Sequence, residues 1–406
     1  MSGGPLERLR GVLAADVYKQ DTGVASLRRE PGGIVFRYRP EHVAAGGGAV
    51  ATTLPVSREP VRTPAGAVPP FFAGLLPEGR RLTSLRRAVK TSADDELSLL
   101  LAVGCDTIGD VRVVPTGESP KPVAPVAQVE ADWREIRFAD VLSDAGIVDP
   151  VGLPGAQEKV SARVISLPVA RAHERYLLKL DPPEYPHLVA NEALFVGLAR
   201  DARLPVVAAE VVHDAEGRAG LLVRRFDRGT RADGSARAFA CEDGCQVLGR
   251  WPADKYNVSM EEVFRGLAGR CAAEAVALRD LFRQVVFAWL TANGDVHAKN
   301  LSILEAASGE WRVAPAYDLP STAPYGDRSM ALSIGGRTAG LSRRHWTAFA
   351  AEVGLPARAA VAALDDLTAR TADLEARLRA AALPFAPKTM ADWLSELRDR
   401  RRLVSA

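Results

Sequence analysis

Two short polar stretches, residues 293–300 and 315–319, constrain this fold more than any other feature. The first reads Asn-Gly-Asp-Val-His-Ala-Lys-Asn and the second Pro-Ala-Tyr-Asp-Leu. Asn293 and Gly294 end a predicted helix whose apolar residues recur at i, i+3, i+4 and i+7, which indicates one buried face. These apolar residues are Leu278, Leu281, Phe282, Val285, Val286, Trp289 and Leu290. A buried helix therefore leads directly into a polar loop.

The chain between the two stretches predicts a β-hairpin. Residues 301–304 and 311–314 read as short strands, and Ala-Ser-Gly-Glu lies in the connection between them. A two-residue turn at Ser-Gly places Asn300 opposite Tyr317, within roughly 5–8 Å across the ladder. Asn300 and Asp318 are then close enough to share a metal ion.

These residue types suit phosphoryl transfer. A phosphoryl group in transfer spreads negative charge over its oxygens, so a protein catalyses mainly by holding Mg²⁺ and orienting the attacking hydroxyl. Mg²⁺ prefers oxygen ligands, usually one or two carboxylates plus phosphates. Asp318 and Asn300 fit the metal ligands, and Asp295 fits the base that accepts the hydroxyl proton. The motif therefore predicts a kinase.

The same residues also have an ordinary structural interpretation. Asn-Gly-Asp favours a tight turn, and an Asp such as Asp318 is typical of a helix N-cap. The tripeptide alone favours this interpretation by roughly four to one. An Asn five residues after Asp295 and a second Asp beyond the hairpin reverse these odds. His297, inside the loop, is interpreted as a structural histidine that is satisfied within the loop.

Composition sets broader limits. The 406 residues suggest two or three domains. A net charge of +2 with 25% charged residues gives no general reason to expect binding to nucleic acid or to a membrane. Neither a signal peptide nor a spanning helix is expected, and the four cysteines have no histidine nearby that would complete a zinc set. We therefore expect a reduced, cytoplasmic protein.

Two changes along the sequence divide the chain. The proline-rich stretch 115–125 is typical of a semi-rigid linker. A softer boundary lies near Phe226, after which the strand-rich pattern ends. The predicted units are therefore residues 1–117, 118–226 and 227–406.

Local sequence patterns predict the secondary structure of each unit. The first unit is predicted to contain a strand at 33–38, a helical region at 71–90 interrupted at Pro77, and a helix at 95–103. Strands dominate the second unit, at 159–167, 176–180 and 220–223, with one helix at about 191–201. The chain after Met260 is mostly helical apart from the hairpin. We therefore expect an α+β, two-lobed, protein-kinase-like fold: an N-terminal α/β subdomain, a β-rich nucleotide-binding lobe and a largely helical C-terminal lobe.

Two segments upstream of the motif are candidates for phosphate binding. Residues 152–159 precede a strand, and their glycines let backbone N–H groups approach phosphates, although Gly-x-x-Gly most often marks an ordinary turn. Lys179 lies in an apolar strand, where it either binds phosphate in a cleft or is solvated on an open face. Glu192, in the next helix, either pairs with Lys179 or interacts with the helix dipole.

With these residues identified, the chain resembles the HipA-type serine/threonine kinases, the toxins of bacterial toxin–antitoxin modules. The stretches that carry the resemblance are residues 72–79, 155–159, 178–180, 225–228, 242–246, 295–300 and 317–318. The resemblance implies ATP- and Mg²⁺-dependent phosphorylation of a protein, typically an aminoacyl-tRNA synthetase and foremost glutamyl-tRNA synthetase, with growth arrest as the result. It also implies a small helix-turn-helix antitoxin of the HipB kind as partner, through which the chain meets DNA only indirectly.

The resemblance implies a role for each site residue. Asp295 is then the general base, and Asn300 and Asp318 are the metal ligands. The nucleotide-binding residues are then Gly155, Ala156, Gln157, Glu158, Lys159, Lys179, Arg225 and Phe226. The chain departs from the family pattern at Arg224, where Glu is frequent, and at Gly152, which corresponds to a serine that the best-known members autophosphorylate.

Two other functions are compatible with the motif. A small-molecule phosphotransferase of the aminoglycoside or choline kinase kind shares the Asp, Asn and Asp arrangement, but lacks an N-terminal unit of this form. A catalytically silent nucleotide-binding protein that braces an antitoxin on DNA is the third possibility. The intact Asp295, Asn300 and Asp318 favour an enzyme, because a buried carboxylate pair without a task is costly.

Overall fold

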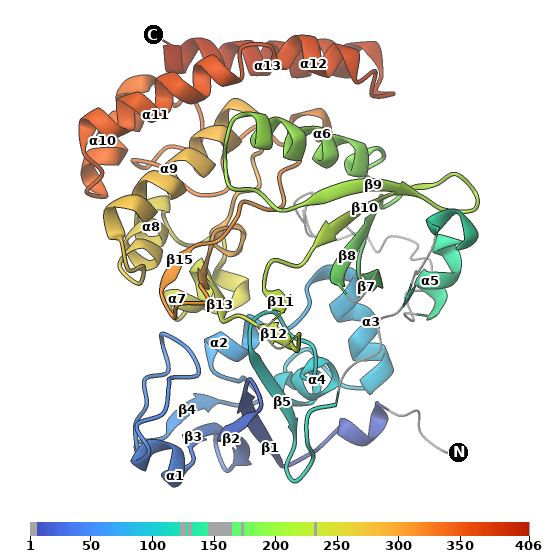
Figure 1. Cartoon of the computed structure of the whole chain (residues 1–406), viewed down its shortest axis with the longest axis vertical. Coiled ribbons are helices and arrows are strands. Elements are labelled where there is room, and N and C mark those ends of the chain that lie inside the picture. The colour runs from blue at the N-terminus through green and yellow to red at the C-terminus, as the bar shows by residue number, and fades with distance from the viewer. Residues whose placement is uncertain are drawn as a thin grey trace.

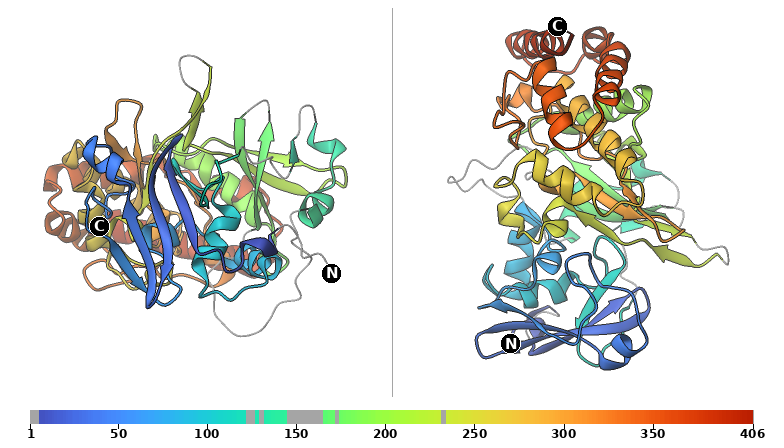
Figure 2. Two further views of the ribbon diagram at one scale, coloured as in Figure 1. Left: turned by 90° about the horizontal axis from the view of Figure 1, so that it is seen from below. Right: turned by 90° about the vertical axis from the view of Figure 1, so that its left-hand side faces the viewer.

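The computed structural model describes residues 6–121, 127–128, 132–144, 165–171, 174–230 and 234–405. An N-terminal unit, a β-rich lobe and a helical lobe follow one another along the chain (Figure 1). The molecule is elongated, with the N-terminal unit at one end and the C-terminal helices at the other (Figure 2). The architecture is mixed α+β, as the sequence predicts.

The N-terminal unit is built on an antiparallel sheet with the strand order β4-β3-β2-β1-β5. Its strands are β1 (Ala14–Lys19), β2 (Thr22–Glu30), β3 (Gly33–Tyr38), β4 (Val61–Pro64) and β5 (Val111–Pro115). Its helices are α1 (Pro40–Ala44), α2 (Pro70–Ala73), α3 (Gly79–Val89) and α4 (Glu96–Val103). The predicted strand, the interruption at Pro77 and the helix near 95–103 are all present, whereas four of the five strands were not predicted. Pro115 is tolerated because β5 is an edge strand that pairs with β1 alone.

The β-rich lobe contains a five-stranded sheet with the order β6-β7-β8-β10-β9. Its strands are β6 (Ala127–Gln128), β7 (Ile165–Arg171), β8 (Glu174–Leu180), β9 (Ala209–His213) and β10 (Ala219–Arg224). Its helices are α5 (Phe138–Asp144) and α6 (Leu188–Asp201). The predicted strand 159–167 meets the described residues only at 165–167, and β7 continues beyond it to Arg171.

The helical lobe packs around α9 (Glu274–Leu290). The other helices are α7 (Gly244–Val247), α8 (Met260–Ala268), α10 (Arg343–Glu352), α11 (Ala357–Arg370), α12 (Leu374–Ala380) and α13 (Pro387–Ser405). A short hairpin, β11 (Arg228–Thr230) and β12 (Ala236–Ala238), precedes a small sheet of β13 (Cys241–Asp243), β14 (Ser302–Glu305) and β15 (Trp311–Val313). The apolar stripe predicted for α9 is buried, but every residue from Gln284 onward is buried too, so α9 is a central helix and not a surface helix with one covered face.

The predicted hairpin forms with a different turn. Leu304 pairs with Arg312, and the Ala306 N–H donates to the Glu310 carbonyl oxygen at 2.7 Å. The bond between Ala306 and Glu310 closes a loop of three residues, 307–309. Gly309 in this loop has a φ of +86°, a backbone conformation that glycine adopts without strain. The predicted two-residue turn, and with it the pairing of Asn300 with Tyr317, is therefore wrong by one residue.

Buried charges join the N-terminal unit to the segment directly after β10. The Arg225 guanidinium contacts Asp106 and Asp227 at 2.8 Å each, and donates to the Thr107 carbonyl oxygen at 2.8 Å. The Gly109 N–H donates to Asp227 at 2.9 Å. Burial would raise the pKa of Asp227, but the Arg225 and Arg228 guanidinium groups bring it below its ordinary value. The two units are thus held together by groups that lie away from solvent.

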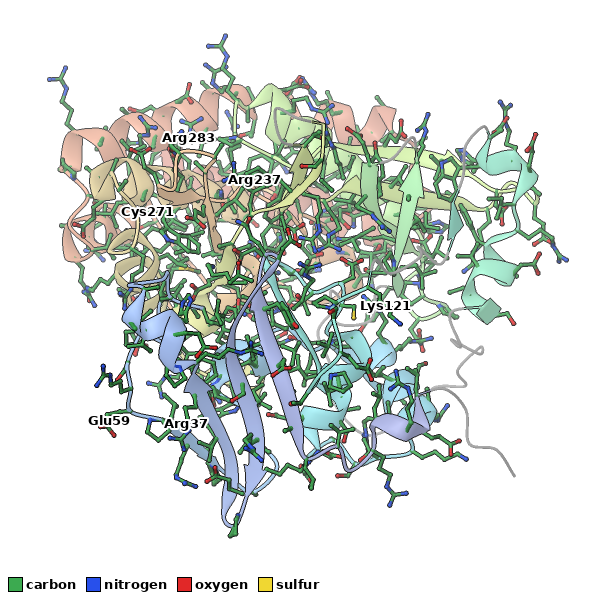
Figure 3. The ribbon with its side chains drawn as sticks, turned by 60° about the horizontal axis from the view of Figure 1, so that its bottom comes forward. Arg37, Glu59, Lys121, Arg237, Cys271 and Arg283 are labelled. Carbon is green, nitrogen blue, oxygen red and sulfur yellow. The ribbon has the colours of Figure 1, made fainter. Side chains whose placement is uncertain are left out.

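The cysteines form no metal site in the described part of the chain. Cys271, just after α8, lies in the helical lobe (Figure 3). All four cysteines are free thiols. No group of three or more His, Cys, Asp or Glu side chains is placed to hold a metal among the described residues. No helix within the described ranges is long and apolar enough to cross a membrane.

The charge cluster around Arg225 predicts a specific loss of stability. Asp227→Asn takes from the buried Arg225 guanidinium the more deeply buried of its two carboxylate partners and leaves only Asp106, so we expect the free energy of unfolding at pH 7 to fall by about 3 kcal/mol. The pKa of Asp227 is lowered in the folded protein. The Asp227 carboxylate therefore stabilises the folded state fully above the carboxyl pKa of an unfolded chain, about 4, and this stabilisation is lost as the pH falls below that value. Urea unfolding across this pH range measures both effects.

The matched control is Asp21→Asn, which changes a carboxylate that pairs with Arg112 but is 79% exposed. Its free energy of unfolding should change by less than about 0.5 kcal/mol. Equal stability of the two variants at pH 7 would contradict the structural role of the Arg225 cluster.

Candidate active site

A cavity of about 610 Å³ lies where the three units meet. Its apolar lining comes from the β-rich lobe and from the segments that follow β10 and β15, through Leu177, Val207, Val223, Phe226 and Tyr317. The N-terminal unit also contributes to the lining, with Leu75, Glu78, Arg81, Ala102 and Thr107. A concave, largely apolar site of this size with a few polar groups suits a small molecule or cofactor.

Lys179, on β8, lines this cavity and is paired with two carboxylates. Its Nζ donates to both Glu192 carboxylate oxygens, at 2.7 and 2.9 Å, and to Asp318 Oδ1 at 3.0 Å. Burial would lower the pKa of Lys179, but the carboxylates of Asp318 and Glu192 raise it above its ordinary value. Lys179 is 9% exposed, so the interpretation of this residue as a solvated lysine on an open strand face is wrong.

Two carboxylates share this one ammonium group. Burial would raise the pKa of Asp318, but Lys179 overcomes burial and lowers it. For Glu192, which lies deeper in α6, burial prevails and the pKa is raised. Two carboxylates thus face one ammonium group, and with both ionised a bound cation would compensate the remaining negative charge.

Asn300 and Asp318 lie side by side, as predicted. Asn300 Nδ2 donates to Asp318 Oδ2 at 3.3 Å and to the Asp295 carbonyl oxygen at 3.0 Å. Asp318 has a φ of +58°, and Asn293 Nδ2 donates to its carbonyl oxygen at 3.2 Å. The next helical turn begins only at Ala323, so Asp318 is not a helix N-cap.

The loop that carries Asp295 is also a tight turn. The Asp295 N–H donates to Asn293 Oδ1 at 3.0 Å, which is the turn chemistry that the sequence predicted. A Cβ on Gly294 would lie 2.4 Å from the Ser329 carbonyl oxygen, so only glycine fits there. The interpretation as a tight turn and the interpretation as a polar site are therefore compatible, because the turn fixes the position of the Asp295 carboxylate.

Phe226 and Tyr317 form an aromatic wall of the cavity. Their rings stack with centroids 5.6 Å apart. The Tyr317 hydroxyl donates to the Lys299 carbonyl oxygen at 2.6 Å, which fixes the ring next to the loop of Asp295. The Arg225 N–H donates to the Arg175 carbonyl oxygen at 2.9 Å, and its side chain belongs to the buried cluster described above. Arg225 thus fixes the chain next to this wall, while Phe226 and Tyr317 line the cavity.

The remaining predicted nucleotide-binding residues lie outside the described residues. These are Gly155, Ala156, Gln157, Glu158 and Lys159, and the same is true of Gly152. Arg224, where the family pattern often has Glu, lines the cavity and pairs with Glu174 at 2.5 Å.

The sequence did not indicate how far the N-terminal unit reaches into the site. The Glu78 carboxylate contacts the Lys255 ammonium group and lies 3.6 Å from Lys299 Nζ. Lys299 also donates to the Gly74 carbonyl oxygen at 3.1 Å and to Asp243 at 3.0 Å. Burial would raise the pKa of Glu78, but Lys299 and Lys255 lower it. Glu78 belongs to the stretch 72–79, but its sequence position alone did not indicate a contact with the loop of Asp295.

His297 is neutral at ordinary pH. Burial, together with the charge of Lys255, lowers the pKa of His297 to about 3. Its backbone N–H and carbonyl oxygen are hydrogen bonded within the loop. Its ring atom Nδ1 is buried without a hydrogen-bond partner among the described residues, so the predicted satisfaction within the loop holds for the backbone but not for this ring atom.

The lobes, the cavity between them and the polar residues at its end define the class of two-lobed, protein-kinase-like proteins, with an added N-terminal unit. Comparison with known proteins gives the family. A HipA N-terminal domain model matches residues 15–114, and a HipA-like C-terminal domain model matches residues 151–374. The chain belongs to the HipA family.

Individual relatives agree with this assignment. Y4mE of Sinorhizobium fredii, a protein named as a kinase, is 31% identical over 330 residues, which cover 76% of this chain and 78% of that protein. The serine/threonine-protein kinase toxin HipA of Shewanella oneidensis is 28% identical over 298 residues, or 65% of each chain. The structure of HipA from Shewanella oneidensis MR-1, solved with HipB and operator DNA, matches with a TM-score of 0.77 over 96% of this chain and 97% of that one, at 22% identity. The kinase-like fold predicted from the sequence is confirmed.

The burial of Lys179 predicts a large effect of its removal. Lys179→Met leaves Glu192 and Asp318 buried beside each other without a cation, so the free energy of unfolding should fall by about 3–5 kcal/mol. A solvated lysine would change it by less than about 0.5 kcal/mol. Urea unfolding distinguishes the two values.

A second variant tests whether the facing charges cause this loss. Adding Glu192→Gln to Lys179→Met removes one of the two facing charges and should restore part of the lost stability. Full stability of Lys179→Met alone would contradict the geometry of the site.

Proposed function

We propose that this chain is an ATP- and Mg²⁺-dependent serine/threonine-protein kinase. One observation carries the proposal: Lys179 lines a largely apolar and aromatic cavity and donates to Asp318, which lies beside Asn300, and Asn300 in turn is bonded to the loop of Asp295. An apolar end suits a nucleotide base, and a polar end suits phosphates with their metal.

The residues fit a magnesium ion. Asn300 and Asp318 offer hard oxygen ligands, and Mg²⁺ commonly takes only one or two such side chains beside phosphates and water. The excess negative charge of Glu192 and Asp318 over Lys179 favours a divalent cation at this place. When bound, the metal would neutralise the charge that develops on the phosphates.

The protein's own groups account for the other parts of the reaction. Lys179 would bind the nucleotide phosphates while Glu192 fixes its position, and the stacked rings of Phe226 and Tyr317 would support the base. Asp295 would accept the proton of the attacking hydroxyl, held by the turn that Asn293 and Gly294 impose. The sheltered cavity would keep water away from the phosphoryl group.

The relatives support a role in a toxin–antitoxin module. The Shewanella oneidensis protein is named as a toxin, and its solved structure contains HipB and operator DNA. We therefore propose a HipB-like helix-turn-helix antitoxin as partner of this chain, with DNA contacted indirectly through it. For the substrate we propose a protein, foremost an aminoacyl-tRNA synthetase such as glutamyl-tRNA synthetase, whose phosphorylation would arrest growth.

One experiment separates the proposal from its two alternatives. The purified chain is incubated with Mg²⁺, γ-labelled ATP and a bacterial lysate. A protein kinase labels a protein band, a phosphotransferase of the aminoglycoside or choline kinase kind labels a small molecule, and a silent nucleotide-binding protein labels nothing. Mass spectrometry of cells that express the chain or its Asp295→Asn form would then name the target.

The proposed roles predict different defects for the two aspartates. Asp295→Asn removes the proton acceptor, so transfer should fall roughly 10²–10⁴-fold while affinity for Mg²⁺-ATP is kept. Asp318→Asn removes a charged metal ligand and should weaken Mg²⁺-dependent binding of ATP itself. Calorimetry and transfer assays measure the two quantities, with Asp21→Asn as the control. Full transfer by both site variants would refute the kinase assignment.

A further inference from the structure

Tyr256 lies on the connection between α7 and α8, far from Asp295 in sequence, yet it touches this residue. The Tyr256 hydroxyl donates to Asp295 Oδ1 at 3.1 Å. Burial, together with the charge of Asp295, raises the pKa of Tyr256 well above its ordinary value. The phenol therefore keeps its proton across the physiological range and acts as a hydrogen-bond donor to the carboxylate.

Neighbouring contacts hold Tyr256 firmly against the loop of Asp295. The Ala298 N–H, inside that loop, donates to the Lys255 carbonyl oxygen at 3.2 Å. The Tyr256 ring meets the His297 ring edge to face, with centroids 5.1 Å apart. Because the backbone and the ring are both fixed to the loop, the position of the hydroxyl relative to Asp295 is also fixed.

The same contacts connect Tyr256 to the N-terminal unit. The Lys255 ammonium group lies 5.3 Å from the centroid of the Tyr256 ring, close enough for a cation–π interaction. That ammonium group also binds Glu78, between α2 and α3. A line of contacts thus runs from Glu78 through Lys255 and Tyr256 to Asp295.

We infer that Tyr256 is a positioning residue for the proposed base: its hydroxyl holds the Asp295 carboxylate in the orientation from which that group takes the proton of the substrate. This inference rests on the proposed function, because that function assigns the role of the base to Asp295. A carboxylate on a short side chain turns about two bonds, and a charge-assisted hydrogen bond from a fixed donor restricts that rotation. Tyr256 itself neither gains nor loses a proton during the reaction.

Tyr256→Phe tests the inference, because it removes only the hydroxyl and keeps the ring against His297. Loss of a charge-assisted hydrogen bond predicts that kcat falls roughly 10- to 100-fold. The KM for ATP should be unchanged, because the contacts described for Tyr256 are with Asp295, His297 and Lys255, none of which is assigned to the nucleotide. Tyr18→Phe is the control, since the Tyr18 hydroxyl donates to the Glu118 carbonyl oxygen at 3.3 Å on the N-terminal sheet.

Two further outcomes overturn the inference. A purely structural role predicts a lower melting temperature with unchanged kcat per folded molecule. A role as phosphate acceptor predicts phosphotyrosine at position 256 of the wild-type chain after incubation with Mg²⁺ and ATP, which peptide mapping detects. Either result would show that Tyr256 does not serve to position Asp295.

A readout that does not need activity keeps this test separate from that of the proposed function. Crystal structures of the wild-type chain and of Tyr256→Phe are compared at the Asp295 side chain. The inference predicts one rotamer in the wild type and a displaced or second rotamer in the variant. An unmoved, singly ordered carboxylate in the variant would overturn the inference, even if the wild-type chain transferred no phosphate to any protein of the lysate.

Discussion

The ion pairs of Lys179 with Glu192 and Asp318 are the contacts on which the rest of this site depends. Three charged groups have been taken out of water at the meeting point of β8, α6 and the segment after β15. Such burial is costly unless each charge has a partner, so the three elements must keep their relative positions. This requirement fixes the β-rich lobe against the helical lobe and thereby sets the width of the cavity between them.

The N-terminal unit completes the site and is not merely attached to it. Its side chains and backbone reach the loop of Asp295 through Glu78 and Gly74, and the segment after β10 through Asp106 and Thr107. Elsewhere, the Thr52 N–H and hydroxyl both donate to Glu242 at 2.8 Å. These contacts are polar, mostly buried and specific in geometry, so the unit has one defined position over the cavity. A two-lobed fold alone would leave this side of the cavity open.

Much of this arrangement could be predicted from the sequence, because it lies in local patterns. The helix α9, the turn after it and the proximity of Asn300 to Asp318 follow from periodicity, turn residues and spacing. The hairpin register did not follow, since a loop with Gly309 at positive φ differs from a two-residue turn by one position. The burial of Lys179 was left open, because an alternating strand does not reveal which of its faces meets another lobe.

Contacts between distant segments were the part that sequence reasoning missed. Tyr256 lies 39 residues before Asp295, in a connection without a periodic pattern, so nothing local marked it. The strands β1 and β2 were overlooked because charged residues interrupt their apolar positions; in the structure Asp16 of β1 is buried and paired with Arg39, whereas Arg28 of β2 is exposed. In each case tertiary packing, and not local propensity, decides the outcome.

The most direct test of the central claim is a crystal structure of the chain with Mg²⁺ and a non-hydrolysable ATP analogue. The account predicts the base against Phe226 and Tyr317, phosphate oxygens at Lys179, and a metal ion held by Asn300 and Asp318. A nucleotide bound outside the cavity, or a bound nucleotide whose metal touches neither Asn300 nor Asp318, would contradict it.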